Sequence, residues 1–302
     1  MNIIYNIKIS FFKFYKVFLF ASLTMVVASF FLLLSKGLNL GIDFKGGTVI
    51  EIKVSKNTSS EKIRSYFLDL KLGDVKVKKF GDDNVYLAIL ENKNNKSDYT
   101  NNLKINLEQK LDDKINFRRV EIVGPKVSDE LSKSGLYAII ISLSLMLIYI
   151  WFRFEWQFSI GAILALLHDV ILTLGIFSLI SLEFNLSIIA AILTIVGYSI
   201  NDTVVIFDRI RENLKKDENS NLNDILNNSI NETLPRTLKT SITTLLALIA
   251  IYIFGGEILR GFSFALIWGV LIGTYSSVFI ASPVLLILNI KRNWNEVIDN
   301  TP

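Results

Sequence analysis

Residues 197–213, GYSINDTVVIFDRIREN, decide the fold class. The stretch begins as the inner, cytoplasmic half of an apolar helix and ends in a charged run. Between the two, Asn201 and Asp202 lie at a depth where apolar residues continue on both sides. A carboxylate inside a membrane span costs a few kcal/mol at least, so an unpaired structural aspartate is not expected there. The stretch therefore predicts a membrane protein in which Asp202 is a candidate functional residue.

The composition agrees with a polytopic membrane protein. Of the 302 residues, 51% are hydrophobic, and several apolar runs reach the roughly 18 residues that mark a candidate span. The chain has no cysteine and a single histidine, His168, which excludes disulfides, thiol chemistry and multi-histidine metal sites. The net charge is only +4, and the basic residues concentrate beside the apolar runs, which indicates membrane topology and not nucleic-acid binding. No metal or cofactor is expected.

Six apolar segments predict six membrane spans. Lysines ahead of the first segment place the N-terminus in the cytoplasm, and Lys291 and Arg292 stop the sixth on the same side. The fifth span is expected to begin behind Pro235, a suitable first helical residue. The expected spans are 16–35, 135–152, 158–181, 186–207, 237–254 and 262–288, with cytoplasmic segments at 1–15, 208–235 and 289–302.

The polar segment 36–134 must lie on the outer, periplasmic side. Four stretches alternate as strands and two have helical spacing, in the order βαββαβ of a ferredoxin-like unit. The predicted fold is therefore an α-helical membrane protein with one α+β domain between its first two spans. The expected strands are 48–54, 74–80, 84–90 and 117–123, and the expected helices are 58–70 and 97–115.

A basic residue lies near the depth of Asp202. The carboxylate stands about five residues, roughly 8 Å, before the inner end of its span, and Arg236 lies at the inner start of the next one. Thr240, Thr243 and Thr244 share the helix face of Arg236. An aspartate that is charged when paired or hydrated, and protonated when the arginine turns away, is the two-state element of a proton-coupled machine. The alternative is a permanent structural ion pair, or a carboxylate in headgroup water.

Other polar residues within spans leave their roles open. His168 and Asp169 lie roughly 16 Å from the inner end of the third span. A secondary relay there competes with hydrogen bonding that only holds the bundle, and neither is favoured. Asn201 is more typical of packing than of a ligand. Gly269 and Gly273 form a GxxxG pattern, which predicts close packing of the sixth span.

The stretch GIDFKGGT, residues 41–48, nearly matches a phosphate-binding loop. Gly47 stands where the phosphate-binding lysine belongs, and the stretch precedes a strand instead of following one. Gly41, Asp43, Gly46 and Gly47 are therefore interpreted as a structural motif, a turn that joins the first span to the outer domain. No chemistry is assigned to Asp43.

Together these motifs closely resemble the SecF family, the smaller subunits of bacterial SecD–SecF protein-export complexes. The resemblance rests on residues 41–48 and 197–213 and on TLPRTLKTSITT at 233–244, with support from 123–131 and 166–179. It covers essentially the whole chain. It implies the six-helix half of a resistance-nodulation-division (RND) type transporter, which a SecD chain completes to twelve spans.

The resemblance also implies a function and a set of partners. The family assists protein translocation through the SecYEG channel of the bacterial inner membrane, driven by protons and without ATP hydrolysis. Asp202, Arg236 and Thr240 match its proton-relay residues, and a further carboxylate lies on SecD. Expected partners are SecD, SecYEG and the unfolded polypeptide, with YajC and YidC as further candidates. Two alternatives stay open: a small-molecule or lipid exporter of the same superfamily, which the single small outer domain disfavours, and a non-transporting scaffold.

Overall fold

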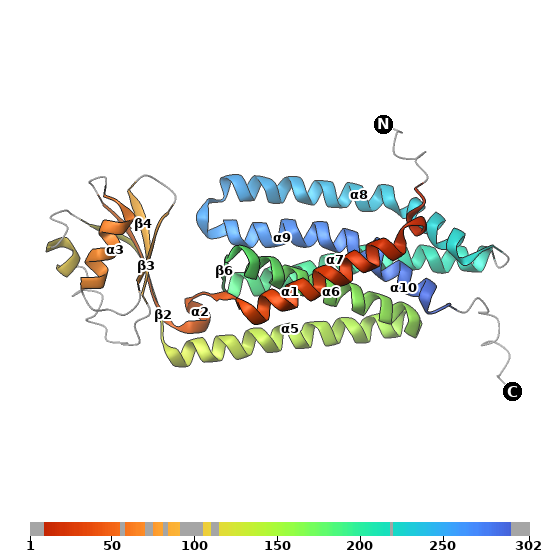
Figure 1. Ribbon diagram of the computed structural model, residues 1–302, viewed down its shortest axis with the longest axis horizontal. Helices are drawn as coiled ribbons and strands as arrows, with labels where there is room; N and C mark the ends of the chain where they lie inside the picture. The colour runs from red at the N-terminus through yellow and green to blue at the C-terminus, as the bar shows by residue number, and fades with distance from the viewer. Residues whose placement is uncertain are drawn as a thin grey trace.

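The computed structural model describes residues 9–54, 58–69, 75–80, 84–90, 105–109, 115–217 and 220–290. A bundle of long helices carries a small sheet domain at one end (Figure 1). The chain enters the bundle at the opposite end, through the short helix η2 (Phe11–Lys13), and leaves it there after α10 (Ser282–Ile287).

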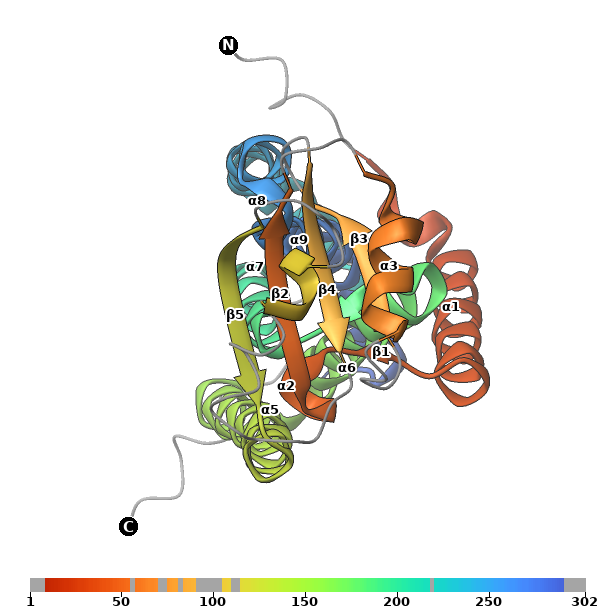
Figure 2. The ribbon, with the colours of Figure 1, turned by 90° about the vertical axis from the view of Figure 1, so that its left-hand side faces the viewer.

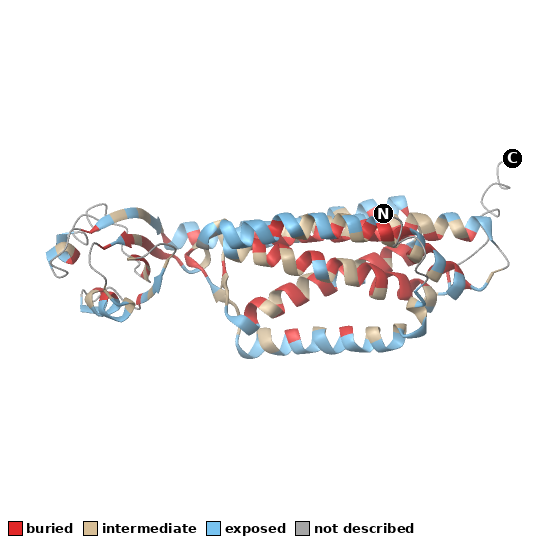
Figure 3. Ribbon diagram, turned by 90° about the horizontal axis from the view of Figure 1, so that it is seen from above, coloured by how far each residue is buried: buried red, intermediate tan, exposed pale blue. Residues whose placement is uncertain are grey.

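The described residues contain six helical segments that are long and apolar enough to cross a membrane, as predicted. Three of them form the interior: between 50% and 61% of the most apolar window of α6, α7 and the last segment is buried, against 11% to 17% for α1, α5 and α8 (Figure 3). The outer three helices therefore present apolar side chains to lipid or to a partner. The bounds are α1 (Tyr15–Ser35), α5 (Pro125–Arg153), α6 (Trp156–Ile180), α7 (Leu186–Lys216), α8 (Leu222–Phe254) and the run α9 (Gly256–Ser276), η3 (Ser277–Ala281) and α10.

The end of α7 and the start of α8 differ from the prediction. The fourth span was expected to end at 207 and the fifth to begin at 237, but α7 continues to Lys216, α8 begins at Leu222, and Pro235 lies inside α8. The helical pattern of residues 222–230 agrees with the start of α8. An internal proline costs a helix about 3 kcal/mol. Burial outweighs that cost, because the apolar residues of this hairpin pack together at helical spacing. They include Phe207, Ile210, Leu214, Leu222, Ile225, Leu226 and Ile230.

Two further bounds differ from the predictions. Helix α5 begins at Pro125 instead of near 135, because Gly124 is extended and Pro125 takes the first helical position. The sixth segment begins at Gly256 instead of near 262, and it is not one regular helix, since π-helical η3 separates α9 from α10. The other predicted spans agree with α1, α6 and the start of α7 to within two residues.

The outer domain has the predicted order of elements. Its four strands form an antiparallel sheet in the order β3-β4-β2-β5, and α3 (Ser60–Asp69) packs against one face through Ile63 and Phe67. Of the second expected helix, residues 105–109 are helical and most of the remainder lies outside the described residues. The strands are β2 (Gly47–Lys53), β3 (Val75–Lys79), β4 (Val85–Leu90) and β5 (Asn116–Val123).

The sheet domain joins the bundle at a compact junction, the root, made of residues 39–47, 123–125 and 183–184. The two-residue strand β1 (Asn39–Leu40) pairs in parallel with β6 (Glu183–Phe184), which lies in the turn between α6 and α7. One helical turn, α2 (Ile42–Lys45), then leads into β2 with only Gly46 between them. On the return path, β5 leads through Gly124 into α5 (Figure 2).

Candidate functional site

Asp202 lies on the buried face of α7 and is 3% exposed. That face repeats every three or four residues through Ile195, Ser199 and Ile206, so the helix carries the carboxylate into the bundle. The Oδ2 atom of Asp202 has no hydrogen-bond partner among the described residues. A buried carboxylate oxygen without a donor is costly unless a proton, water or a cation satisfies it.

Arg236 lies at the same level on α8. Helix α7 ends at Lys216 and α8 begins at Leu222, and Asp202 precedes Lys216 by as many residues as Arg236 follows Leu222. The two residues lie on α7 and α8, which pack against each other. No ion pair joins the two side chains in the described part of the chain, and Arg236 is exposed on the bundle surface. The structure thus places the two residues on neighbouring helices without direct contact.

The threonines beside Arg236 are partly committed to their own helix. Thr240 donates to the carbonyl of Thr237 at 2.9 Å, and the Thr243 hydroxyl likewise bonds within α8. Thr244 accepts from Tyr198 of α7 at a long 3.5 Å. The oxygen atoms of these threonines keep free lone pairs that can accept a hydrogen bond from water. The helix face that Thr240, Thr243 and Thr244 share with Arg236 can therefore accept further hydrogen bonds. The buried hydroxyl oxygen of Thr237 lacks a partner among the described residues.

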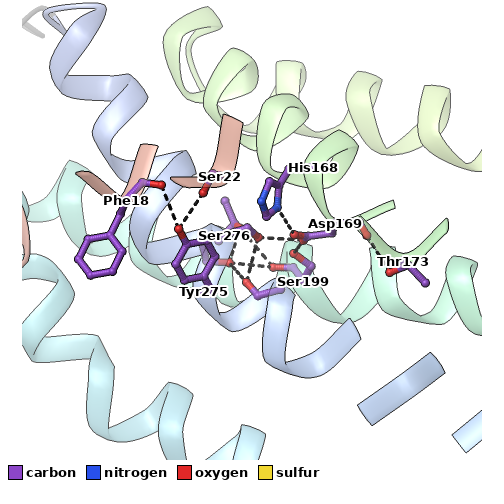
Figure 4. A network of polar contacts seen from close by, with 11 residues as sticks. Phe18, Ser22, His168, Asp169, Thr173, Ser199, Tyr275 and Ser276 are labelled. Carbon is purple, nitrogen blue, oxygen red and sulfur yellow. Dashed lines mark hydrogen bonds and ion pairs between the residues drawn. The ribbon is translucent and has the colours of Figure 1, made fainter. Parts of the chain in front are cut away.

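A second carboxylate, Asp169, has a full set of donors. It is 0% exposed, and its Oδ2 atom accepts from Ser199 at 2.6 Å and from Ser276 at 2.8 Å. Its Oδ1 atom lies 3.1 Å from Nδ1 of the adjacent His168. Figure 4 shows these side chains converging on Asp169 from α6, α7 and α9. The arrangement ties the three interior helices together.

The polar network continues toward α1. His168 Nε2 is buried without a partner among the described residues, and the His168 ring lies 6.0 Å from the ring of Tyr275. The Tyr275 hydroxyl shares a hydrogen bond of 2.7 Å with Ser22 and donates to the carbonyl of Phe18 at 3.1 Å (Figure 4). Ser22 and Tyr275 could not be identified from the sequence, because a single hydroxyl in a span usually bonds to its own helix.

Helix α7 is held on both sides of Asp202. Ser199, one turn earlier, is bound to Asp169, and Thr203 shares a hydrogen bond of 2.8 Å with Ser277, the first residue of π-helical η3. Helix α9 approaches closely here, since a Cβ on Gly273 would lie 2.9 Å from the Cβ of Ser199. The predicted close packing at the GxxxG pattern is confirmed. Single π-helical turns often occur at functional sites.

The remaining candidates lie apart from both carboxylates. Asn201 is exposed on α7 and belongs to neither network. The glycine motif lies at the outer end of α7, where Asp43 Oδ2 accepts from the backbone N–H of Leu186 at 2.9 Å. Gly47 has a φ of +141°, and a Cβ there would lie 2.5 Å from the carbonyl oxygen of Leu90, so only glycine fits. Within the described ranges, no group of three or more His, Asp or Glu side chains is placed to hold a metal ion.

Two family models match the chain. The model described as protein export membrane protein SecD/SecF, C-terminal, matches residues 104–291, and the SecD/SecF GG motif matches residues 31–58. Curated proteins named protein translocase subunit SecF are also similar. The one from Ketogulonicigenium vulgare is 40% identical over 98% of this chain and 93% of that protein. The one from Vibrio alginolyticus is 44% identical over 94% of this chain and 91% of that protein.

Solved structures show the same relationship. The crystal structure of SecDF from Thermus thermophilus, described as a translocon-associated membrane protein, matches with a TM-score of 0.85 and 33% identity over 94% of this chain. SecDF in a super-membrane-facing form matches over the same share with 34% identity but a TM-score of 0.71. The chain spans 39% of the length of each solved chain. The elements shared with this chain are therefore arranged differently in the two solved structures.

Proposed function

The chain belongs to the SecD/SecF family of protein-export membrane proteins, as a SecF subunit in protein translocation, and from that premise we propose that proton exchange at Asp202 drives its work. It is a multi-pass membrane protein, and its family indicates an auxiliary role beside the channel. In the proposal it hydrolyses no ATP and lies in the bacterial inner membrane. Both termini are cytoplasmic and the sheet domain is periplasmic.

The observation that supports the relay is the unsatisfied oxygen of Asp202. The carboxylate is buried, its Oδ2 atom lacks a donor among the described residues, and Arg236 lies on the neighbouring helix without direct contact. Such a group can take up and release a proton without breaking an existing set of hydrogen bonds. When Asp202 is charged, Arg236 is drawn toward it. When it is protonated, Arg236 is released.

The proposed cycle moves a proton inward and shifts two helices. Asp202 takes a proton from the outer side and releases it inside, with Thr240 lining the path. Each charge that crosses the membrane supplies about 2.3 kcal/mol per 100 mV, and each pH unit adds about 1.4 kcal/mol. The resulting shift of α7 and α8 moves the sheet domain, which binds or releases the emerging polypeptide. Support for movement comes from the two SecDF forms, which match this chain with different TM-scores.

The surface beside the relay implies a partner chain. Asn201 of α7 and Arg236 of α8 are both exposed polar residues beside the buried Asp202, near the inner ends of their predicted spans. In the proposal a SecD chain covers this surface and contributes a further carboxylate to the proton path. The complex then acts on polypeptide leaving SecYEG, with YajC and YidC as additional candidates for association.

The direct test replaces Asp202 with asparagine, which keeps the size of the side chain and removes its exchangeable proton. The Asp202→Asn variant, assembled with SecD, is expected to lose at least nine-tenths of the export that depends on a proton gradient. Asp208→Asn is the matched control, since Asp208 lies on the same helix in a surface ion pair with Arg153. Full gradient-dependent export in an assembled Asp202→Asn complex would refute the relay.

A charge exchange separates the relay from a scaffold. Two substitutions, Asp202→Arg with Arg236→Asp, keep the attraction between the helices but move the carboxylate to the exposed position. Loss of export from an intact complex supports the relay, and full recovery supports a structural pair. The small-molecule exporter is not favoured, because the similar curated proteins are named as translocase subunits.

A further inference from the structure

The glycine motif, residues 41–48, has no task in the proton cycle, although it lies where the sheet domain meets the bundle. Two backbone links hold its start to the turn before α7. Asn39 and Leu40 pair in parallel with β6, and the N–H of Gly41 donates to the carbonyl of Phe184 at 2.8 Å. The rings of Phe44 and Phe184 add a stacked contact at 5.8 Å. The first half of the motif is therefore attached to the turn that precedes α7.

Asp43 makes the most specific of these links. Its Oδ2 atom accepts from the N–H of Leu186, the first residue of α7, at 2.9 Å. The ordinary N-cap residue, Asn185, accepts from Ile188 at 3.3 Å, so the first turn of α7 has two caps. One of them comes from a segment 143 residues earlier in the chain. The negative charge of Asp43 also faces the positive end of the helix dipole.

The other end of the motif continues into the sheet without a flexible linker. Gly46 and Gly47 have φ angles of +73° and +141°, and β2 begins at Gly47. Gly47 is already paired with Val123 of β5. The central strand of the sheet is thus connected through one turn of helix to the first turn of α7 (Figure 2).

We infer that Asp43 is a positioning residue that makes the sheet domain and α7 move as one body. Asp202 lies 16 residues along α7 from Leu186, about 24 Å at 1.5 Å per residue. Helix α7 is held by Ser199 and Thr203 near Asp202 and by Asp43 at its first turn. A movement of α7 at Asp202 therefore also moves its first turn. This inference rests on the proposed function and adds the route by which a helix shift at Asp202 reaches the sheet domain.

Two substitutions test the link in the full complex with SecD. Asp43→Ala removes the acceptor for Leu186 and is expected to lower gradient-dependent export at least fivefold without preventing assembly. Asp43→Asn keeps an acceptor oxygen and is expected to retain at least half of it. Asp129→Ala is the control, because Asp129 is an exposed carboxylate at the beginning of α5, close to the same root.

A covalent link tests why Asp43→Ala loses export. A disulfide can restore export if the lost connection is the cause, but not if the variant is generally unstable. Asn39 and Glu183 are Cα partners in the β1–β6 pair, and the chain has no cysteine of its own. A disulfide between Asn39→Cys and Glu183→Cys is expected to restore most of the export lost in Asp43→Ala, and reduction is expected to remove it again. Absence of rescue in the oxidised, assembled complex would overturn the inference.

A distance measurement separates this inference from the relay itself. Spin labels at Ser65→Cys on α3 and Phe254→Cys at the outer end of α8 are both exposed. Asp202→Asn is expected to change their separation when Asp43 is present, and to leave it unchanged in Asp43→Ala. If the separation still follows Asp202 in Asp43→Ala, or Asp43→Ala exports fully while Asp202→Asn is inactive, the coupling alone is wrong. Full export in Asp202→Asn overturns the relay and the coupling with it.

Discussion

Asp169 and Asp202 are both buried in the same helical bundle, on the neighbouring helices α6 and α7, but their surroundings differ. Asp169 accepts from two serines and contacts His168, whereas Asp202 leaves Oδ2 without a donor among the described residues. A change of charge at Asp169 would disturb two contacts between helices, those to Ser199 and Ser276, and one to His168 on its own helix. The same change at Asp202 breaks none at Oδ2. Burial therefore does not by itself identify a relay, and the number of satisfied oxygen atoms separates a structural carboxylate from an exchangeable one.

The largest effect on stability is expected at Asp169. Asp169→Ala leaves two serine hydroxyls and a histidine buried without their acceptor, which costs about 3 kcal/mol at the usual penalty for unsatisfied groups. The thermal midpoint of the purified complex is expected to fall by several degrees. A midpoint equal to that of the unmodified protein would show that Asp169 does not hold the three helices together.

A smaller loss is expected where α9 meets α7. A methyl group at Gly273 meets Ser199 at 2.9 Å, so Gly273→Ala is expected to cost about 1–2 kcal/mol through overpacking. Gly197→Ala on α7 is the matched control, because nothing lies within 4 Å of its added Cβ. Thermal melting of the two variants compares them directly. Equal melting would place α7 and α9 further apart than described.

A still smaller loss is expected for each serine around Asp169. Ser276→Ala removes one hydrogen bond to the carboxylate and is expected to cost about 1 kcal/mol. Combination with Asp169→Asn tests whether the two side chains act on each other, since residues in contact give non-additive losses. Strictly additive midpoints in such a double-mutant cycle would argue against the hydrogen bond.

The smallest change in stability is expected at Asp202. Asp202→Asn breaks no hydrogen bond at Oδ2 and removes a buried charge, so the free energy of unfolding is expected to fall less than in Ser276→Ala. Export falls in the same variant. Thermal melting and export are to be measured on the same preparations of Asp202→Asn and Asp169→Ala. A large loss of stability in Asp202→Asn would contradict the proposed difference between the two aspartates.

The fold was predictable where one segment decides its own structure. Apolar runs and strand alternation located the six helical segments and the order of the sheet. The bounds near Pro235 were wrong, because a local rule places proline at a helix start whereas packing between the two arms of the hairpin decides the outcome. Length and hydropathy likewise gave no sign of the π-helical turn at Ser277–Ala281.

The candidate site was predictable to a similar extent. Depth along two antiparallel helices was enough to place Asp202 and Arg236 on neighbouring elements at one level. The shell around Asp169 was not predictable, because Ser199 and Ser276 come from helices far apart in the sequence and isolated serines form no pattern. Asp43 was assigned to a structural turn, but its hydrogen bond to Leu186 was not predictable, since Leu186 lies across the turn between two other spans.

The root of the sheet domain has a consequence for evolution. Gly47 and Val123, the residues at which the chain enters and leaves the sheet, are directly paired. Insertions are best tolerated where the two ends of the inserted unit lie close together. The sheet domain is thus an insertion whose two connections to the helical bundle lie side by side. Mutations can enlarge, shorten or alter this domain while the six helices, and the carboxylates within them, keep their packing.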